Sequence, residues 1–316
     1  MTFEFETKTF TNGNINKDHE DHSLAPRTWD TYIGQEVVKE RLRVSIEGAL
    51  SRYEPLKHVL ILGMPGTGKT SLAEIIASEM GADLLALTMT PNFKMQFLYK
   101  KIKEFEGGVI FLDEIHTLPK KSQHYLLDVL EKKKMTYDSG KVEYIDKPIT
   151  FIGATTDPDD LIEPLYDRFP IRHTLQAYSD LEMAKIVERM ALKLGLYPTK
   201  EACIALGRAS AGIPRQARRL VFAAQDLGDL SNVDEILDAC GITPEGLTED
   251  HLAYMKSLYE LGGKAGIVNL ANHSGRPRDI VERLEKLLVT KSYVEITPSG
   301  RVLSYDGMKA LKEALS

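Results

Sequence analysis

The chain has 316 residues, enough for two or three domains that each bury a hydrophobic core. Hydrophobic residues make up 43% of the sequence and charged residues 27%, and the net charge of −6 excludes a protein that is basic throughout, so any contact with DNA requires a local basic patch. No apolar run approaches the ~20 residues needed to span a bilayer, and the first residues lack the pattern of a signal peptide. Cys203 and Cys240 lie in apolar helical patterns, so we expect buried thiols in the cytoplasm and no association with membranes.

The N-terminal stretch, residues 1–25, has five acidic residues against two lysines and no apolar periodicity. We predict a mobile acidic tail, in which Phe3, Phe5 and Phe10 are candidates for docking against the rest of the chain.

The next segment leads into a helix predicted from about Glu36 to Arg52. Just before this helix, Tyr32 and Ile33 place an aromatic and a β-branched residue in a turn. These two residues either anchor the packing of the segment or form a wall for an adenine ring, and the residues alone favour neither interpretation.

A glycine-rich loop between an apolar run and an amphipathic pattern is the most informative motif. Val59–Leu62 predicts a buried strand, Gly63-x-x-x-x-Gly68-Lys69-Thr70 matches the phosphate-binding P-loop, and Lys69–Met80 predicts a helix. Glycines allow backbone N–H groups to converge on phosphate oxygens, and the helix N-terminus adds partial positive charge. A glycine turn before an ordinary helix is the alternative. The expected phosphate-binding residues are Gly63, Pro65, Gly66, Thr67, Gly68, Lys69, Thr70 and Ser71.

Two acidic residues end a later apolar run. After a predicted strand at Asp83–Thr88 and a helix at Phe93–Phe105, the run Val109–Leu112 leads into Asp113 and Glu114. In a P-loop protein, Lys69 is expected to reach the β- and γ-phosphates, and Thr70 and Asp113 are expected to hold Mg²⁺. Glu114 is expected to polarise the attacking water, and the alternative is a pair of solvated carboxylates.

The following segment predicts a helix at Gln123–Lys134, a hairpin between Met135 and Pro148, and a buried strand at Ile149–Ala154. Thr156, just beyond this strand, either touches the γ-phosphate or caps the strand end. Arg168 taken alone is typical of a surface ion pair. Strands that alternate with helices predict an α/β domain with a parallel sheet.

The pattern then becomes helical. Ser179-x-x-Glu182 is a capping box, and it opens an amphipathic helix that ends at Gly195. Three more helices are predicted at Glu201–Ser210, Pro214–Asp226 and Asn232–Cys240. Arg215 follows Pro214 in a first helical turn, where a cation opposes the helix dipole unless an anion is nearby.

The C-terminal part predicts helices at Thr248–Leu261, Lys264–Asn272 and Pro277–Lys291, then a hairpin of Tyr293–Thr297 and Arg301–Tyr305. Three helices and a hairpin indicate a winged-helix domain. Residues 246–316 contain ten basic and nine acidic residues, so the domain is near neutral. Its basic residues either gather on one face or form part of a mixed surface; they are Arg276, Arg278, Arg283, Lys286, Lys291 and Arg301.

In its order of motifs, the chain resembles RuvB, the AAA+ motor family of Holliday-junction branch migration. The likeness runs from about Pro26 to the C-terminus. Besides the P-loop, the matching phrases are Tyr32-Ile-Gly-Gln35, Leu112-Asp-Glu-Ile-His116, Ile152-Gly-Ala-Thr-Thr156, Asp167-Arg-Phe169, Gly212-Ile-Pro-Arg215 and Thr297-Pro-Ser-Gly-Arg301.

This resemblance implies an ATPase that uses ATP and Mg²⁺, releases ADP, and forms a hexameric ring around duplex or junction DNA. It implies that Thr156 is sensor 1, that Arg168 is a finger reaching the γ-phosphate of a neighbouring subunit, and that Arg215 is sensor 2. Tyr32 and Ile33 belong to the adenine pocket of the family, and Tyr178 and Pro214 are further expected nucleotide contacts.

Three features depart from the family pattern. The hairpin within Met135–Lys147, which in the family docks the RuvA partner, is shorter. Ile296 and Ser299 replace arginines of the wing, so that Arg301 is the remaining expected DNA contact. The acidic tail is longer than usual.

We therefore predict a tail (1–25), an AAA+ nucleotide-binding domain (26–178), a helical lid domain (179–245) and a winged-helix domain (246–316). The expected function is that of an ATP-hydrolysing ring motor, a helicase or translocase that acts on DNA. Two alternatives are an ATP-dependent loader or switch that remodels a protein partner without moving along DNA, and a regulatory DNA-binding ATPase.

Overall fold

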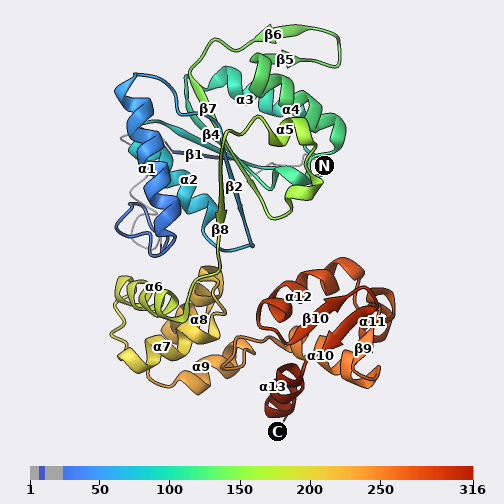
Figure 1. Cartoon of the computed structure of the whole chain (residues 1–316). Coiled ribbons are helices and arrows are strands. Elements are labelled where there is room, and N and C mark those ends of the chain that lie inside the picture. Colours follow the sequence, from blue (N-terminus) through green and yellow to red (C-terminus); the bar gives the residue numbers. More distant parts are fainter. Residues whose placement is uncertain (1–6, 11–23, 316) are drawn as a thin grey trace. The chain divides into compact units, whose positions relative to one another are not determined.

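The computed structural model describes residues 7–10 and 24–315, and the chain divides into two compact units, Met1–Tyr178 and Ser179–Ser316 (Figure 1). The helices expected for the lid and the elements expected for the winged helix both belong to the second unit. Each unit has its own buried apolar core, as the length of the chain predicts.

The first unit is built on a six-stranded sheet with the strand order β1-β3-β4-β7-β2-β8. Strands β2, β3, β4, β7 and β8 run parallel, and β1 is antiparallel to β3. Every residue of β7 is buried, which explains its largely apolar sequence. The strands are β1 (Thr7–Phe10), β2 (Val59–Gly63), β3 (Leu84–Thr88), β4 (Gly108–Asp113), β7 (Ile149–Thr155) and β8 (Ile171–Leu175).

Helices cover both faces of this sheet (Figure 1). The core on one face includes side chains of α1 (Glu36–Ser51) and α2 (Lys69–Glu79), and the core on the other includes side chains of α3 (Met95–Glu104) and α4 (Lys120–Lys132). The predicted hairpin forms from β5 (Lys134–Thr136) and β6 (Val142–Tyr144), and the short helix α5 (Glu163–Tyr166) precedes β8. The expected α/β architecture is confirmed.

Two strands of this sheet differ from the sequence prediction. Thr7–Phe10, which lie within the segment predicted as a mobile acidic tail, form β1 and pair with β3 through the backbone. Pairing to an edge strand requires no apolar periodicity. Phe3 and Phe5 lie outside the described residues, as does the side chain of Phe10. Strand β8 was not predicted, because its alternating sequence Ile-Arg-His-Thr-Leu lacks the continuous apolar run of β2, β3 and β4.

The second unit begins with four helices, close to their predicted positions: α6 (Asp180–Lys193), α7 (Lys200–Ala209), α8 (Pro214–Leu227) and α9 (Val233–Cys240). The predicted capping box is present, since Ser179 and Glu182 each accept a hydrogen bond from the other's backbone N–H. Cys203 and Cys240 are buried. Burial raises the pKa of the Cys203 thiol to about 11, so this thiol is protonated at neutral pH.

The winged-helix part follows and has its own core. Its three-stranded sheet has the order β10-β11-β9. The elements are α10 (Glu249–Glu260), β9 (Lys264–Ala265), α11 (Ile267–Ser274), α12 (Arg278–Thr290), β10 (Val294–Thr297), β11 (Gly300–Leu303) and α13 (Tyr305–Leu315).

The helix predicted from Lys264 begins later than expected. Lys264 and Ala265 form β9, which pairs with β11, and α11 starts at Ile267. The pairing is close, because a Cβ at Gly300 would lie 2.6 Å from the Ala265 carbonyl oxygen, and Gly300 has φ +124°. Only glycine fits at that point. The predicted strand from Arg301 ends at Leu303, and the unpredicted helix α13 follows it.

In the part of the chain that the structure describes, every helix is too short or too polar to cross a bilayer.

His58 provides a test of how the first core is held together. It precedes β2, accepts a hydrogen bond at Nδ1 from the Phe151 N–H at 3.1 Å, and packs edge-on against Phe151 and Phe169. Burial lowers its pKa from 6.5 to about 4, against a hydrogen bond to Leu130 that raises it, and the charge of Lys133 lowers it further. His58 is therefore neutral in the folded protein at pH values where the unfolded chain already binds a proton.

We expect the free energy of unfolding to fall as the pH drops from 6.5 towards 4, by up to about 3 kcal/mol from His58 alone. A His58→Gln variant keeps hydrogen-bonding atoms but does not titrate, so its stability should depend less on pH over that range. Urea unfolding followed by circular dichroism at several pH values measures the difference. His273→Gln removes an exposed histidine and serves as the control; equal pH dependence in wild type and His58→Gln would contradict the prediction.

Candidate nucleotide site

The P-loop connects the end of β2 to the start of α2, at the edge of the sheet where the parallel strands end. Gly66 and Gly68 have positive φ angles of 81° and 102°. A Cβ at Gly68 would lie 3.0 Å from the Tyr32 hydroxyl, and one at Gly63 would lie 3.1 Å from Leu175. The lack of a Cβ at Gly63 and Gly68 therefore allows neighbouring side chains to approach the loop closely, and Gly66 and Gly68 adopt the backbone angles that the turn requires.

Lys69 is the first residue of α2, and its side chain lies against the backbone of the P-loop. Its Nζ donates to the carbonyl oxygens of Gly63 at 2.8 Å and Met64 at 3.2 Å, and the residue is 6% exposed. An ammonium group held against the loop is in position to meet the phosphates that a P-loop binds.

Two tyrosines from outside the P-loop donate hydrogen bonds to its backbone. The Tyr178 hydroxyl donates to the Thr67 carbonyl oxygen at 3.1 Å, and the Tyr32 hydroxyl donates to the Gly68 carbonyl oxygen at 3.4 Å. Both rings are buried. Burial raises the pKa of Tyr32 well above its ordinary value, and contact with Tyr178 raises it further. Ile33 is half-buried next to Tyr32 in the chain.

The two predicted carboxylates sit at the end of β4. Glu114 has φ 52° and ψ 47°, a left-handed conformation, and its backbone N–H donates to Asp113 Oδ1 at 3.0 Å. A left-handed residue directly after the strand turns the chain sharply, and such conformations cluster at functional sites.

Glu114 is held by groups that follow β4 and β7. The Thr156 hydroxyl donates to Glu114 Oε2 at 3.3 Å, and His116 Nδ1 lies 3.2 Å from the same oxygen. His116 Nδ1 is also 3.0 Å from the Thr155 hydroxyl. The structure thus brings Glu114 and Thr156 together, as expected for a site at this edge.

His116 was not assigned a role from the sequence. The available signal was its position two residues after the acidic pair, and the structure places it in a short 3-10 helix, Ile115–Thr117.

The oxygen donors of Thr70 and Asp113 suit Mg²⁺, which binds few protein ligands and completes its shell with waters and phosphates. Among the described residues there is no cluster of three or more His, Cys, Asp or Glu side chains that would form an all-protein metal site. This donor set fits a metal that arrives with a nucleotide.

Arg168 follows α5 and forms an ion pair with Glu131 of α4, with NH2 2.9 Å from Oε1. Its buried Nε has no hydrogen-bond acceptor among the described residues. The interaction that the sequence suggests for Arg168 taken alone, a surface ion pair, is therefore present within the chain.

Pro214 and Arg215 are the first two residues of α8, in the second unit. Arg215 is exposed. A cation in this first turn meets the positive end of the helix dipole, so the position suits an arginine that binds an anion.

Arg301, the expected DNA contact, has a partner in its own domain. Its Nε and NH2 donate to the two carboxylate oxygens of Glu285 at 2.7 and 3.1 Å, and Tyr254 also donates to Glu285. Glu285 is 4% exposed. The pair links the wing strand β11 to α12, and it raises the pKa of Arg301.

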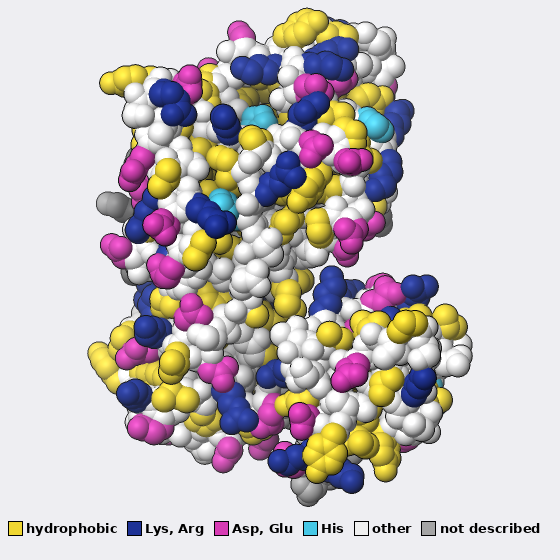
Figure 2. All heavy atoms as spheres, in the orientation of Figure 1, with side chains coloured by type: hydrophobic (Ala, Val, Ile, Leu, Met, Phe, Trp, Pro, Cys, Tyr) yellow, Lys and Arg dark blue, Asp and Glu magenta, His cyan; other side chains and the backbone are white. Residues whose placement is uncertain are grey.

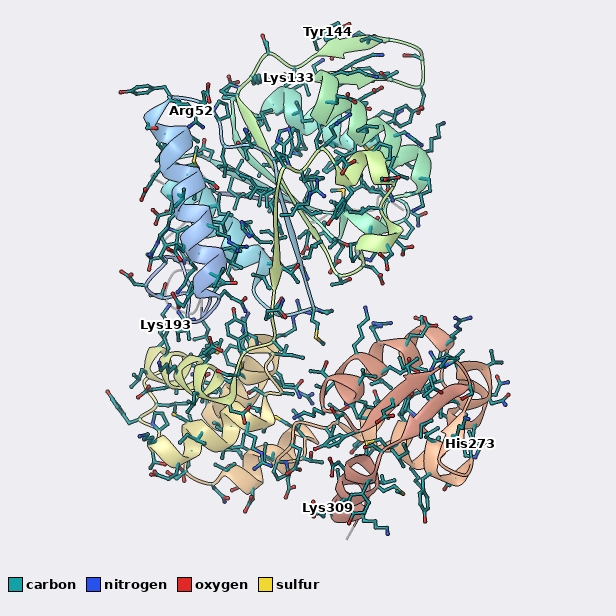
Figure 3. The ribbon with its side chains drawn as sticks, viewed as in Figure 1. Arg52, Lys133, Tyr144, Lys193, His273 and Lys309 are labelled. Atoms are coloured by element: carbon teal, nitrogen blue, oxygen red, sulfur yellow. The ribbon has the colours of Figure 1, made fainter. Side chains whose placement is uncertain are left out.

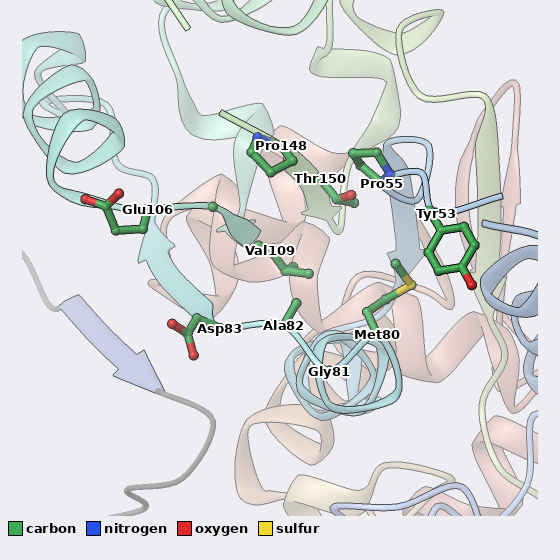
Figure 4. Close-up of a pocket in the computed structure, with 12 residues that line it drawn as sticks. Tyr53, Pro55, Met80, Gly81, Ala82, Asp83, Glu106, Val109, Pro148 and Thr150 are labelled. Atoms are coloured by element: carbon green, nitrogen blue, oxygen red, sulfur yellow. The ribbon is translucent and has the colours of Figure 1, made fainter. Parts of the chain in front are cut away.

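A separate pocket of about 490 Å³ lies at the opposite edge of the sheet, where the parallel strands begin (Figure 4). Its lining includes Tyr53, Met80, Asp83, Glu106 and Thr150. It also contains Gly81, Gly107 and Gly108, but it adjoins the C-terminal end of α2 and not a helix N-terminus, so the sheet geometry distinguishes it from the nucleotide site.

A P-loop after β2, a threonine after the neighbouring strand β7 and two carboxylates at the end of β4, the strand beyond β7, define an AAA+-type nucleoside-triphosphatase. A model of the Holliday junction DNA helicase RuvB P-loop domain matches residues 24–175, and a model of the RuvB C-terminal winged helix domain matches residues 244–312. The chain belongs to the RuvB family.

Individual relatives agree over almost the whole length. The Holliday junction branch migration complex subunit RuvB of Campylobacter fetus is 36% identical over 299 residues, covering 90% of this chain and 87% of the relative. The RuvB subunit of Ligilactobacillus salivarius is 33% identical and covers 91% of each. The solved structure of the Thermotoga maritima RuvB Holliday junction branch migration motor superposes with a TM-score of 0.81 at 32% identity, covering 92% of this chain and 98% of that one.

Arg301→Ala should destabilise the winged-helix part, because it leaves the buried Glu285 carboxylate with only the Tyr254 hydroxyl. We expect a loss of about 3 kcal/mol in the free energy of unfolding. The double variant Arg301→Met with Glu285→Gln removes both charges and should lose much less. Calorimetric unfolding of the full chain measures both, and equal losses in the single and double variants would contradict the buried pair as the cause.

Proposed function

We propose that the chain is an ATP-hydrolysing ring motor that drives branch migration of Holliday junctions. The observation that supports this most directly is the Glu114–Thr156 contact beside a complete P-loop, in a chain that matches the RuvB family along its length. Fold, site and relatives therefore all support this function.

The proposed ATP site divides the work among five groups. The N–H groups from Gly66 to Thr70 bind the phosphates, and Lys69 neutralises the β- and γ-phosphates. Thr70 and Asp113 hold Mg²⁺, which supplies positive charge to the phosphate oxygens. Glu114 orients the attacking water, and Thr156 holds Glu114 and meets the γ-phosphate as sensor 1.

The adenine pocket is proposed to include Tyr32, Ile33 and Tyr178, since both tyrosines already lie on the P-loop. Pro214 and Arg215 are proposed to contribute from the helical lid, with Arg215 as the cation for the γ-phosphate. Pro65 within the loop and Ser71 in the first turn of α2 are the remaining proposed contacts.

We propose that the winged-helix domain, residues 246–316, contacts the backbone of duplex or junction DNA. Because Glu285 engages the guanidinium of Arg301, a phosphate contact by Arg301 must share that group with Glu285. On the face shown in Figure 2, basic and acidic side chains are interspersed, so we expect few phosphate contacts per subunit, and a ring of subunits adds them together.

A partner protein of the RuvA type is a further proposal, since the relatives are named as subunits of a branch migration complex. Val142 and Tyr144 are exposed on the hairpin, at 39% and 73%, and offer an apolar contact; Tyr144 is labelled in Figure 3. As a DNA motor, the protein is proposed to act in the cytoplasm.

A loader or switch that remodels a protein partner remains the second candidate. The observation that favours it is the wing, where Ile296 is exposed and Arg301 is already paired. Stimulation of ATP hydrolysis by DNA separates the two functions, because a loader that acts on a protein partner is not expected to hydrolyse ATP faster in the presence of a four-way junction.

The first test is ATP turnover with and without four-way junction DNA. We expect the junction to stimulate the wild type. Glu114→Gln keeps size but not charge, so it should bind ATP and lose turnover at least ~100-fold. Lys69→Ala should weaken binding itself. Normal turnover in Glu114→Gln would contradict the catalytic assignment, and turnover that ignores DNA would favour the loader.

The second test asks whether Arg168 acts on a neighbouring subunit. An arginine finger is worth about 10³–10⁵ in rate. Within this chain, the Arg168 guanidinium pairs with Glu131 of α4. Arg168→Ala and Lys69→Ala should each be nearly inactive.

Mixing these two variants should restore turnover, because some interfaces then join an intact Arg168 to an intact P-loop. Dilution below the assembly concentration should abolish the restored activity. Co-assembly without recovery would make Arg168 a residue of its own subunit.

A further inference from the structure

Gln35 has an unusual conformation and an unusual partner. It is the residue before α1, with φ 56° and ψ 34°, and its side chain does not cap that helix. Instead, Nε2 donates to the Gln176 carbonyl oxygen at 2.7 Å, and Oε1 accepts from the Gln176 N–H at 3.1 Å. One side chain thus satisfies both backbone groups of a residue 141 positions away. We call this pair of hydrogen bonds the Gln35 clamp.

The Gln35 clamp fixes the chain just before Tyr178. Gln176 directly follows β8, and Tyr178 comes two residues later. Tyr178 is 6% exposed, and its hydroxyl donates to the Thr67 carbonyl oxygen at 3.1 Å. The position of Tyr178 on the P-loop therefore depends on a backbone segment that Gln35 holds.

The hydrogen bond from Tyr178 sets the direction of a P-loop amide. The Thr67 carbonyl and the Gly68 N–H belong to the same planar trans peptide, so they point in opposite directions. Holding the carbonyl oxygen on Tyr178 turns the Gly68 N–H to the other side of the loop. A P-loop binds phosphate through such N–H groups, and one that is already oriented need not be reordered on binding.

We propose that Gln35 is a positioning residue of the nucleotide site: through Gln176 and Tyr178, it holds the Gly68 N–H in the orientation that binds phosphate. This inference rests on the proposed ATP site. Gln35 does not itself touch the nucleotide. Its left-handed backbone is uncommon for a residue with a side chain, and the clamp requires that side chain.

The test measures ADP binding by calorimetry and ATP turnover in single and double variants. Gln35→Gly removes the amide and adopts the left-handed backbone freely, so it separates the clamp from strain. We expect ADP binding to weaken about five- to tenfold, the effect of losing one or two hydrogen bonds. KM for ATP should rise in the same proportion, whereas kcat should change little because Glu114 and Lys69 are intact.

The double variant decides whether Gln35 acts through Tyr178. Tyr178→Phe should weaken ADP binding to a similar extent, and adding Gln35→Gly should weaken it no further. Fully additive losses, or wild-type affinity in Gln35→Gly, would overturn the inference. If Gln35→Gly does not fold, Gln35→Asn provides a second variant, since asparagine tolerates this backbone but has a shorter amide.

The outcomes separate this inference from the function on which it rests. A wild-type protein that fails to bind ADP would contradict the proposed ATP site. A second outcome is that the wild type binds ADP, that the control variant Lys69→Ala does not, and that Gln35→Gly binds ADP as tightly as the wild type. This outcome would contradict only the role of Gln35.

Discussion

Parallel pairing of β2, β4 and β7 is the constraint on which the site depends. Leu62 of β2 pairs with Thr155 of β7, and Leu112 of β4 pairs with Gly153 of β7, so all three strands end at nearly the same level. The P-loop, the acidic pair and Thr156 follow these ends directly. No single segment contains the site; the register of hydrogen bonds between strands assembles it, and the two buried cores hold that register.

Local signals predicted most of the elements. The P-loop, the buried strands and the capping box at Ser179 depend on residues within a few positions of one another, so the sequence displays them. The strands that were missed depend on distant partners. Strand β8 has a polar alternating sequence and is held by β2, and β9 contains only Lys264 and Ala265 and is held by β11.

The same distinction applies to the functional side chains. Motif spacing was sufficient to nominate Glu114 and Thr156, but their mutual contact and the participation of His116 needed the sheet. The ion-pair partners of Arg168 and Arg301 also could not be predicted from the sequence. Glu131 and Glu285, which bind Arg168 and Arg301, precede them by 37 and 16 positions, and no motif marks either carboxylate as a partner.

The buried pair of Glu285 and Arg301 has a mechanical consequence. Force applied to the tip of the wing is passed from β11 into the middle of α12 through two hydrogen bonds to one carboxylate, in addition to the covalent connection through β10. The wing and α12 therefore resist bending relative to each other. For the proposed contact between this domain and a duplex, stiffness is an advantage, since a compliant domain would lose part of each motor step as deformation of the protein.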